Sequence, residues 1–121
     1  MLYRVEHPVS ISLYAPNFYH GLGLPQFRLL APSPQLLADY KAHKITVWQY
    51  TEQYNKYLET LNAKDVVQNI IHMASSPFKE LSHEDITLLC YEKSGEFCHR
   101  HLVAEWLTNN GYLTEEEVWL P

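Results

Sequence analysis

Residues 85–107 read DITLLCYEKSGEFCHRHLVAEWL, and this stretch decides the fold. Its first part, residues 86–91, is a short apolar run with β-branched and aromatic members, which is typical of a buried strand. The tripeptide KSG at residues 93–95 breaks that run. Apolar residues then return at helical spacing until an Asn-Gly pair ends the pattern. The stretch therefore predicts a strand that turns directly into a helix over residues 96–108.

The junction between this strand and this helix concentrates reactive side chains. A helix amino terminus has unpaired backbone N–H groups and the positive end of the helix dipole, so it attracts anions. The predicted first turn and its surroundings contain a cysteine, a histidine, an arginine and two glutamates: Cys98, His99, Arg100, Glu92 and Glu96. We therefore expect an anion-binding or catalytic site at this junction.

Each residue of the Cys-His-Arg motif has a predicted role and an alternative. Cys98, at a helix amino terminus beside a cation, is expected to be a nucleophile with a lowered pKa, although a cysteine on an apolar stripe is also a packing residue. His99 is expected to face inwards, either as a hydrogen-bonded core group or as a ligand contact. Arg100 lies at the unfavourable end of the helix dipole, so we expect Glu92 or a bound anion to compensate its charge. Glu92 is also a candidate general base.

The segment ITLLCYEKSGEFCHRHLVAEWL resembles the carboxy-terminal signature of a bacterial and phage family, domain of unknown function 488. That signature is an apolar strand, an acidic residue, a short gap and Cys-His-Arg at the start of a helix. Upstream, VSIS, APNFYHG and LAPSPQLL resemble one subclade of the family, in which we expect the amino-terminal segment to be longer and to carry small hydroxyl residues. The resemblance favours a ligand-contacting or catalytic role for Cys98, but it implies no particular reaction.

The length of 121 residues indicates a single domain, residues 1–121, and a composition with 46% apolar and 19% charged residues indicates a soluble globular protein. The formal charge of −5 argues against a general basic surface for nucleic acid, and leaves a local basic cleft around Arg100 as an option. No run approaches the roughly 20 apolar residues that cross a membrane, and no signal peptide is recognisable. We therefore expect a cytoplasmic protein whose two cysteines are free thiols.

The rest of the chain predicts a second strand and three helices. Residues 9–14 are rich in β-formers, and helical segments without a hairpin turn separate them from residues 86–91. The two strands are therefore expected to be adjacent and parallel, in an α/β fold with a small, mostly parallel sheet flanked by helices. Two helices are expected to begin at polar caps, Ser33 before Pro34 and Thr46 with Gln49 as a capping box, and a third helix is expected to begin at Asn62 or Ala63.

The helix after Thr46 carries tyrosines at helical spacing, Tyr50, Tyr54 and Tyr57. We expect this stripe to pack in the core; stacking of bases or formation of a partner surface is the alternative. The rival to a ligand site is accordingly a non-catalytic interaction module or homodimer, using this helix or the segment around Trp119.

Residues 15–32 form a Pro- and Gly-rich connection in which we expect no regular element. It follows a strand, and ligands of α/β folds bind outside the carboxyl ends of strands. Its candidates for ligand contact are Asn17, Tyr19, His20 and Arg28. In the alternative, its aromatic residues simply fold the loop onto the core.

No metal or cofactor is expected. Cys90, Cys98, His99 and His101 lie close in sequence, but their spacing does not match zinc-site templates, and we interpret Cys90 as a core residue. His101 and Glu105 are expected to be solvated. No Gly-rich phosphate loop is present. The expected partner is a small anionic ligand or a nucleotide, with a nucleic-acid end as a further option and no membrane.

Overall fold

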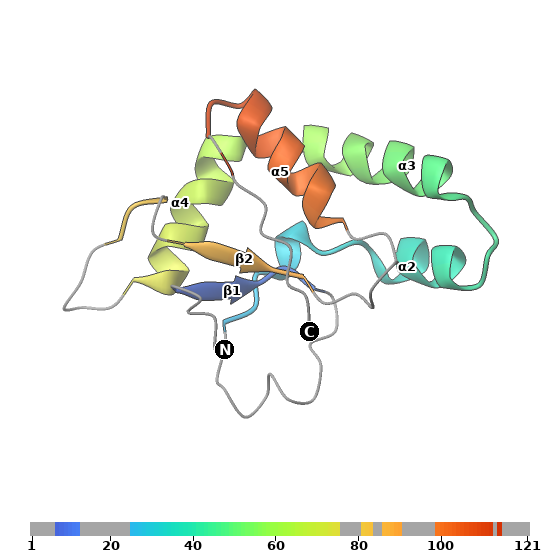
Figure 1. Ribbon diagram of the computed structural model, residues 1–121, viewed down its shortest axis with the longest axis horizontal. Helices are drawn as coiled ribbons and strands as arrows, with labels where there is room; N and C mark the ends of the chain where they lie inside the picture. The colour runs from blue at the N-terminus through green and yellow to red at the C-terminus, as the bar shows by residue number, and fades with distance from the viewer. Residues whose placement is uncertain are drawn as a thin grey trace, which may run out of the picture.

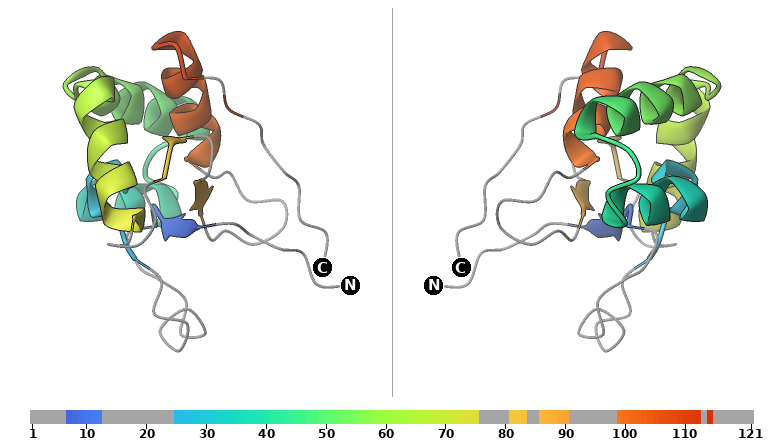
Figure 2. Two further views of the ribbon diagram at one scale, coloured as in Figure 1. Left: turned by 90° about the vertical axis from the view of Figure 1, so that its left-hand side faces the viewer. Right: turned by 90° about the vertical axis from the view of Figure 1, so that its right-hand side faces the viewer.

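The computed structural model describes residues 7–12, 25–75, 81–83, 86–90, 99–112 and 114. Its elements, in chain order, are β1 (Pro8–Ser10), the 3-10 helix η1 (Arg28–Leu30), α2 (Pro34–Lys41), α3 (Val47–Glu59), α4 (Ala63–Ala74), β2 (Thr87–Leu89) and α5 (Arg100–Asn109). The fold is α/β, as predicted, with helices packed on a small parallel sheet. Figures 1 and 2 show α3 and α5 side by side above the strands, and α4 packs against β1.

The two strands are adjacent and parallel, which confirms the prediction of a helical crossover between them. A further segment pairs with the other edge of β1 through a bridge between Ser10 and Gln26. There Ser10 N–H donates to Pro25 O (2.9 Å), and Phe27 N–H donates to Ser10 O (2.7 Å). β1 is therefore central. The expectation that residues 15–32 hold no regular element is wrong at their carboxyl end, which contributes this bridge and η1.

Both strands are shorter than predicted. β1 covers three residues where the sequence predicts 9–14, although Ile11 N–H still donates to Leu89 O (2.8 Å). β2 likewise covers the middle of residues 86–91. Residues 13, 14 and 91 lie outside the described part of the chain.

The helix starts follow their caps as predicted. Ser33 Oγ accepts from the backbone three residues later (3.1 Å), and Asn62 Oδ1 does the same (3.1 Å). At α3 the capping box is complete, because Thr46 N–H donates to Gln49 Oε1 (2.9 Å) and Gln49 N–H donates to Thr46 Oγ1 (3.1 Å). These bonds satisfy backbone groups that a helix end leaves unpaired.

The tyrosine stripe of α3 belongs to the core. Tyr50 and Tyr54 are buried, and Tyr57 is half-buried. The hydroxyl of Tyr54 donates to Leu30 O, and that of Tyr57 donates to Leu29 O (2.5 Å). Burial, followed by the neighbouring tyrosines, raises the pKa of Tyr54 above its usual value. The packing interpretation is confirmed, so the stripe is not a free surface.

α5 begins at Arg100 with His99 as its N-cap, whereas the sequence predicts a start at residue 96. Residues 96–98 lie outside the described part of the chain. Among the described helices, none has the length and apolar character needed to span a membrane.

Candidate functional site

The candidate site lies where the two strands end. Because β1 and β2 are parallel, their carboxyl ends reach the same edge of the sheet, the position at which α/β folds bind ligands. Figure 1 shows both arrowheads pointing one way, with the first turn of α5 above that end. His99 and Arg100 begin this helix. The segment that pairs with Ser10 is also parallel to β1, so the chain leaves it for η1 at the same edge.

His99 joins the helix start to β1. Its side chain is 3% exposed, and Nε2 lies 2.9 Å from Ile11 O. The ring packs edge-on against Tyr54, with centroids 5.5 Å apart. Burial lowers the pKa of His99 below its usual range, and the bond to Ile11 O offsets part of that effect. The prediction that His99 faces inwards is confirmed, and its burial favours the neutral form of the ring.

The contact with Ile11 also fixes the tautomer of His99. A carbonyl oxygen can only accept, so Nε2 carries the hydrogen and donates it. In the neutral ring Nδ1 then has a lone pair, and it lies 3.4 Å from Cys90 Sγ. A thiol at Cys90 would donate its hydrogen to this nitrogen. The geometry thus places a base beside a cysteine at the end of β2.

Cys90 is disulfide-bonded in this structure, which corrects the expectation of free thiols for this residue. The chain has two cysteines, and the other, Cys98, lies outside the described residues. Cys90 packs half-buried against the core, as predicted, and the contact with His99 adds a polar partner that the sequence did not indicate.

Arg100 is half-buried in the first turn of α5. Its Nε is shielded from solvent and has no hydrogen-bond acceptor among the described residues. The first turn of α5 contains no acidic residue. The predicted partner, Glu92, lies outside the described part of the chain, so the predicted pairing is untested.

Two serines at the end of β1 were missed as site residues. Ser10 and Ser12 are both buried, and Ser12 N–H donates to Ser10 Oγ (3.3 Å). Successive side chains of a strand point to opposite faces, so in a half-buried strand the two serines would be assigned to the solvent face. A central parallel strand is covered on both faces, so a hydroxyl there occupies a buried position next to the site. The motif VSIS, with serines inside an apolar strand, was the available signal.

The other predicted site residues divide into two groups. Cys98, Glu92, Asn17, Tyr19 and His20 lie outside the described residues. Arg28 is described: it lies on η1, is exposed, and donates to Gln26 Oε1 (3.3 Å). The described part thus brings Cys90 and His99 into contact, with Arg100 as the next residue along α5, and it places Arg28 on the segment next to β1.

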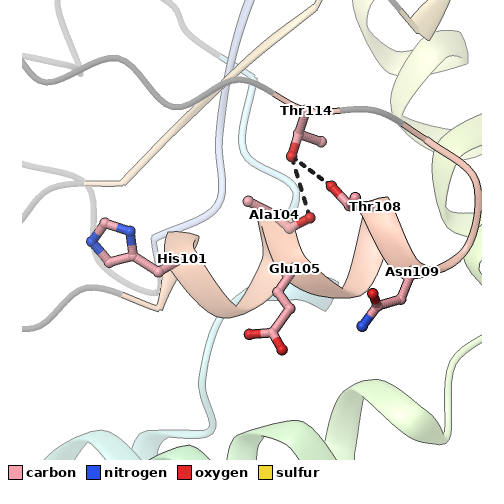
Figure 3. A pocket seen from close by; sticks show the side chains of 6 residues that line it. All are labelled: His101, Ala104, Glu105, Thr108, Asn109 and Thr114. Carbon is pink, nitrogen blue, oxygen red and sulfur yellow. Dashed lines mark hydrogen bonds between the residues drawn. The ribbon is translucent and has the colours of Figure 1, made fainter.

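A hollow of about 400 Å³ lies along the outer face of α5, lined by His101, Ala104, Glu105, Thr108, Asn109 and Thr114. Figure 3 shows the side chains around this hollow projecting in different directions. The hydroxyl of Thr114 forms hydrogen bonds with Thr108 Oγ1 (3.1 Å) and Ala104 O (3.2 Å). His101 and Glu105 are exposed, as predicted. Within the described segments, no three His, Cys, Asp or Glu side chains are grouped as metal ligands. This hollow lacks the convergent groups of the strand-end site.

Comparison with protein families gives a match over residues 22–111 to the model DUF488-N3a, described as the active DUF488-N3 subclade. The match includes Cys90, His99 and Arg100. Comparisons with curated proteins and with solved structures find no match.

Proposed function

Because the chain belongs to the DUF488 family, we propose that it is an enzyme that binds a small anionic ligand, of nucleotide or phosphate type, at the carboxyl edge of β1 and β2. The subclade is described as active, which supports catalysis over a purely structural role. The proposed site comprises Arg100 as the anion-binding group, His99 as a base and a cysteine as the nucleophile.

Arg100 is the observation that carries this proposal. A buried donor without a partner costs about 1–3 kcal/mol, and a cation in the first helical turn costs a further 0.3–1 kcal/mol or so when exposed. In the described structure neither cost has a visible compensation. An anion above the first turn would accept from Nε, neutralise the guanidinium and use the helix dipole. The planar guanidinium suits phosphate and carboxylate groups in particular.

Cysteine chemistry requires the reduced chain. Cys98 is the nucleophile that the sequence predicts, and catalysis with Glu92 as a general base is the alternative that it leaves open. Cys90 is the thiol for which the described geometry supplies a base, since Nδ1 of His99 faces its sulfur. Proton transfer from Cys90 to His99 would give a thiolate beside an imidazolium that still donates to Ile11 O.

Alkylation of the fully reduced protein with iodoacetamide tests this function. We expect one cysteine to react faster than an unperturbed thiol at neutral pH, and inorganic phosphate or a nucleoside monophosphate to slow that reaction. Arg100→Lys keeps the charge but loses the planar fork, so ligand protection should weaken; Lys64→Ala, which removes an exposed charge on α4, should not change it.

The variants Cys90→Ser and Cys98→Ser identify the reactive thiol. Loss of fast labelling in Cys90→Ser assigns the nucleophile to the cysteine beside His99, and loss in Cys98→Ser assigns it to the motif cysteine. Slow labelling of both thiols, without any protection by anions, would contradict the proposal and favour the interaction module.

A further inference from the structure

Trp48 is the most exposed large apolar side chain of the described residues, at 79%. It is the second residue of α3, two positions before the buried Tyr50. Two residues correspond to about 200° of helix rotation, so Trp48 projects from the face opposite the core. Packing within the chain therefore does not explain its presence.

Basic residues lie four to seven positions before this tryptophan in the chain. Lys41, His43 and Lys44 are all exposed at the end of α2 and in the connection to α3. Residues 40–48 contain no acidic residue, although the whole chain has a formal charge of −5. Backbone bonds of His43 N–H to Tyr40 O (3.1 Å) and of Lys44 N–H to Asp39 O (2.9 Å) order this connection. Positive charge and an open aromatic ring thus occur together on an otherwise acidic protein.

We propose that this surface, Lys41–Trp48, binds single-stranded nucleic acid. Trp48 stacks on a base, and Lys41 and Lys44 contact the phosphates on either side. Aromatic side chains next to cations are the elements from which strand-binding surfaces are built. The surface lies at the connection between α2 and α3, on the side towards which both strands point in Figure 1.

A nucleic-acid strand suits this surface better than a protein does. Protein interfaces need a contiguous apolar core, and the exposed large apolar residues of the described part are dispersed over four positions, Leu29, Val47, Trp48 and Met73. Only Val47 is next to Trp48 in the chain. A base needs one ring, and its phosphates need the nearby lysines. The inference does not depend on the proposed anion site, because it uses none of its residues.

Binding of a fluorescent oligothymidylate, followed by anisotropy at low salt, tests the proposal. Trp48→Ala should weaken binding about 5- to 150-fold, and Trp48→Phe, which keeps a ring, should recover part of the affinity. Lys44→Gln should lower the slope of log K against log salt by about 0.7. Lys64→Gln removes the same charge from an exposed position on α4 and should leave both quantities unchanged.

Three results would overturn the proposal. The first is an equal affinity of wild type and Trp48→Ala for the oligothymidylate. The second is an equal effect of Lys44→Gln and Lys64→Gln on the salt slope. The third is the absence of oligonucleotide binding at low salt. Binding of polyglutamate, or self-association lost in Trp48→Ala, without oligonucleotide binding would assign the surface to a protein partner instead. Circular dichroism checks that each variant is folded. We expect both Trp48 variants to fold, because this side chain is exposed and contributes little to the core.

Discussion

His99 offers a test that separates its role in stability from its role in chemistry. In His99→Ala, Ile11 O loses its donor, and Tyr54 loses the ring packed against it. An orphaned buried acceptor costs about 1–3 kcal/mol, and a large-to-small change in a core costs about 2–5 kcal/mol. Since these terms overlap at one site, we expect a loss of about 3–5 kcal/mol in the free energy of unfolding.

His99→Gln is the matched variant. Its side-chain amide reaches the position of Nε2 and can still donate to Ile11 O, so we expect a loss of only about 1 kcal/mol. It has no lone pair on a ring nitrogen at the position of Nδ1, so the reactivity proposed for Cys90 should be lost. Urea denaturation of the reduced proteins measures the stability, and iodoacetamide labelling measures the reactivity. A His99→Ala protein within about 0.5 kcal/mol of wild type, close to the error of such a comparison, would refute the reasoning.

A buried hydrogen bond, a helix cap and the pH dependence of stability provide three further tests. Tyr54→Phe leaves Leu30 O without its donor, and urea denaturation should show a loss of about 1–3 kcal/mol. Thr46→Ala removes the cap of α3, and the same measurement should show a loss of about 0.5–2 kcal/mol. Because burial lowers the pKa of His99, the unfolded chain binds more protons below about pH 6.5, so stability should fall with decreasing pH by up to about 1.4 kcal/mol per unit. His99→Gln should reduce that slope, and His72→Gln, at an exposed position, should retain it.

Local signals explain what the sequence predicted correctly. The caps at Ser33, Thr46 and Asn62 depend on side chains within three residues of the groups they satisfy, so the chain itself specifies them. The parallel pairing of the strands followed from the helical segments between them and the lack of a hairpin turn. The inward direction of His99 followed from its helical spacing to Leu102 and Val103, which are buried.

Non-local contacts explain what was missed. The pairing of Gln26 with β1 rests on a single bridge, which is too short to leave a periodic pattern. Ser10 is buried because both edges and both faces of β1 are covered, a fact of tertiary structure. The contact between Cys90 and His99 joins residues nine positions apart, and no periodic pattern in the sequence specifies it.

The central claim is that Arg100 binds an anion, and its Nε–H group can be observed directly. In a ¹⁵N-correlated NMR spectrum of the reduced protein, titration with inorganic phosphate or a nucleoside monophosphate should shift the Arg100 Nε signal in a saturable way. That signal is assigned by its loss in Arg100→Lys, which should also bind the anion more weakly. An Arg100 Nε signal that does not move through millimolar ligand, or that moves no more than the signal of the exposed Arg28, would contradict the claim.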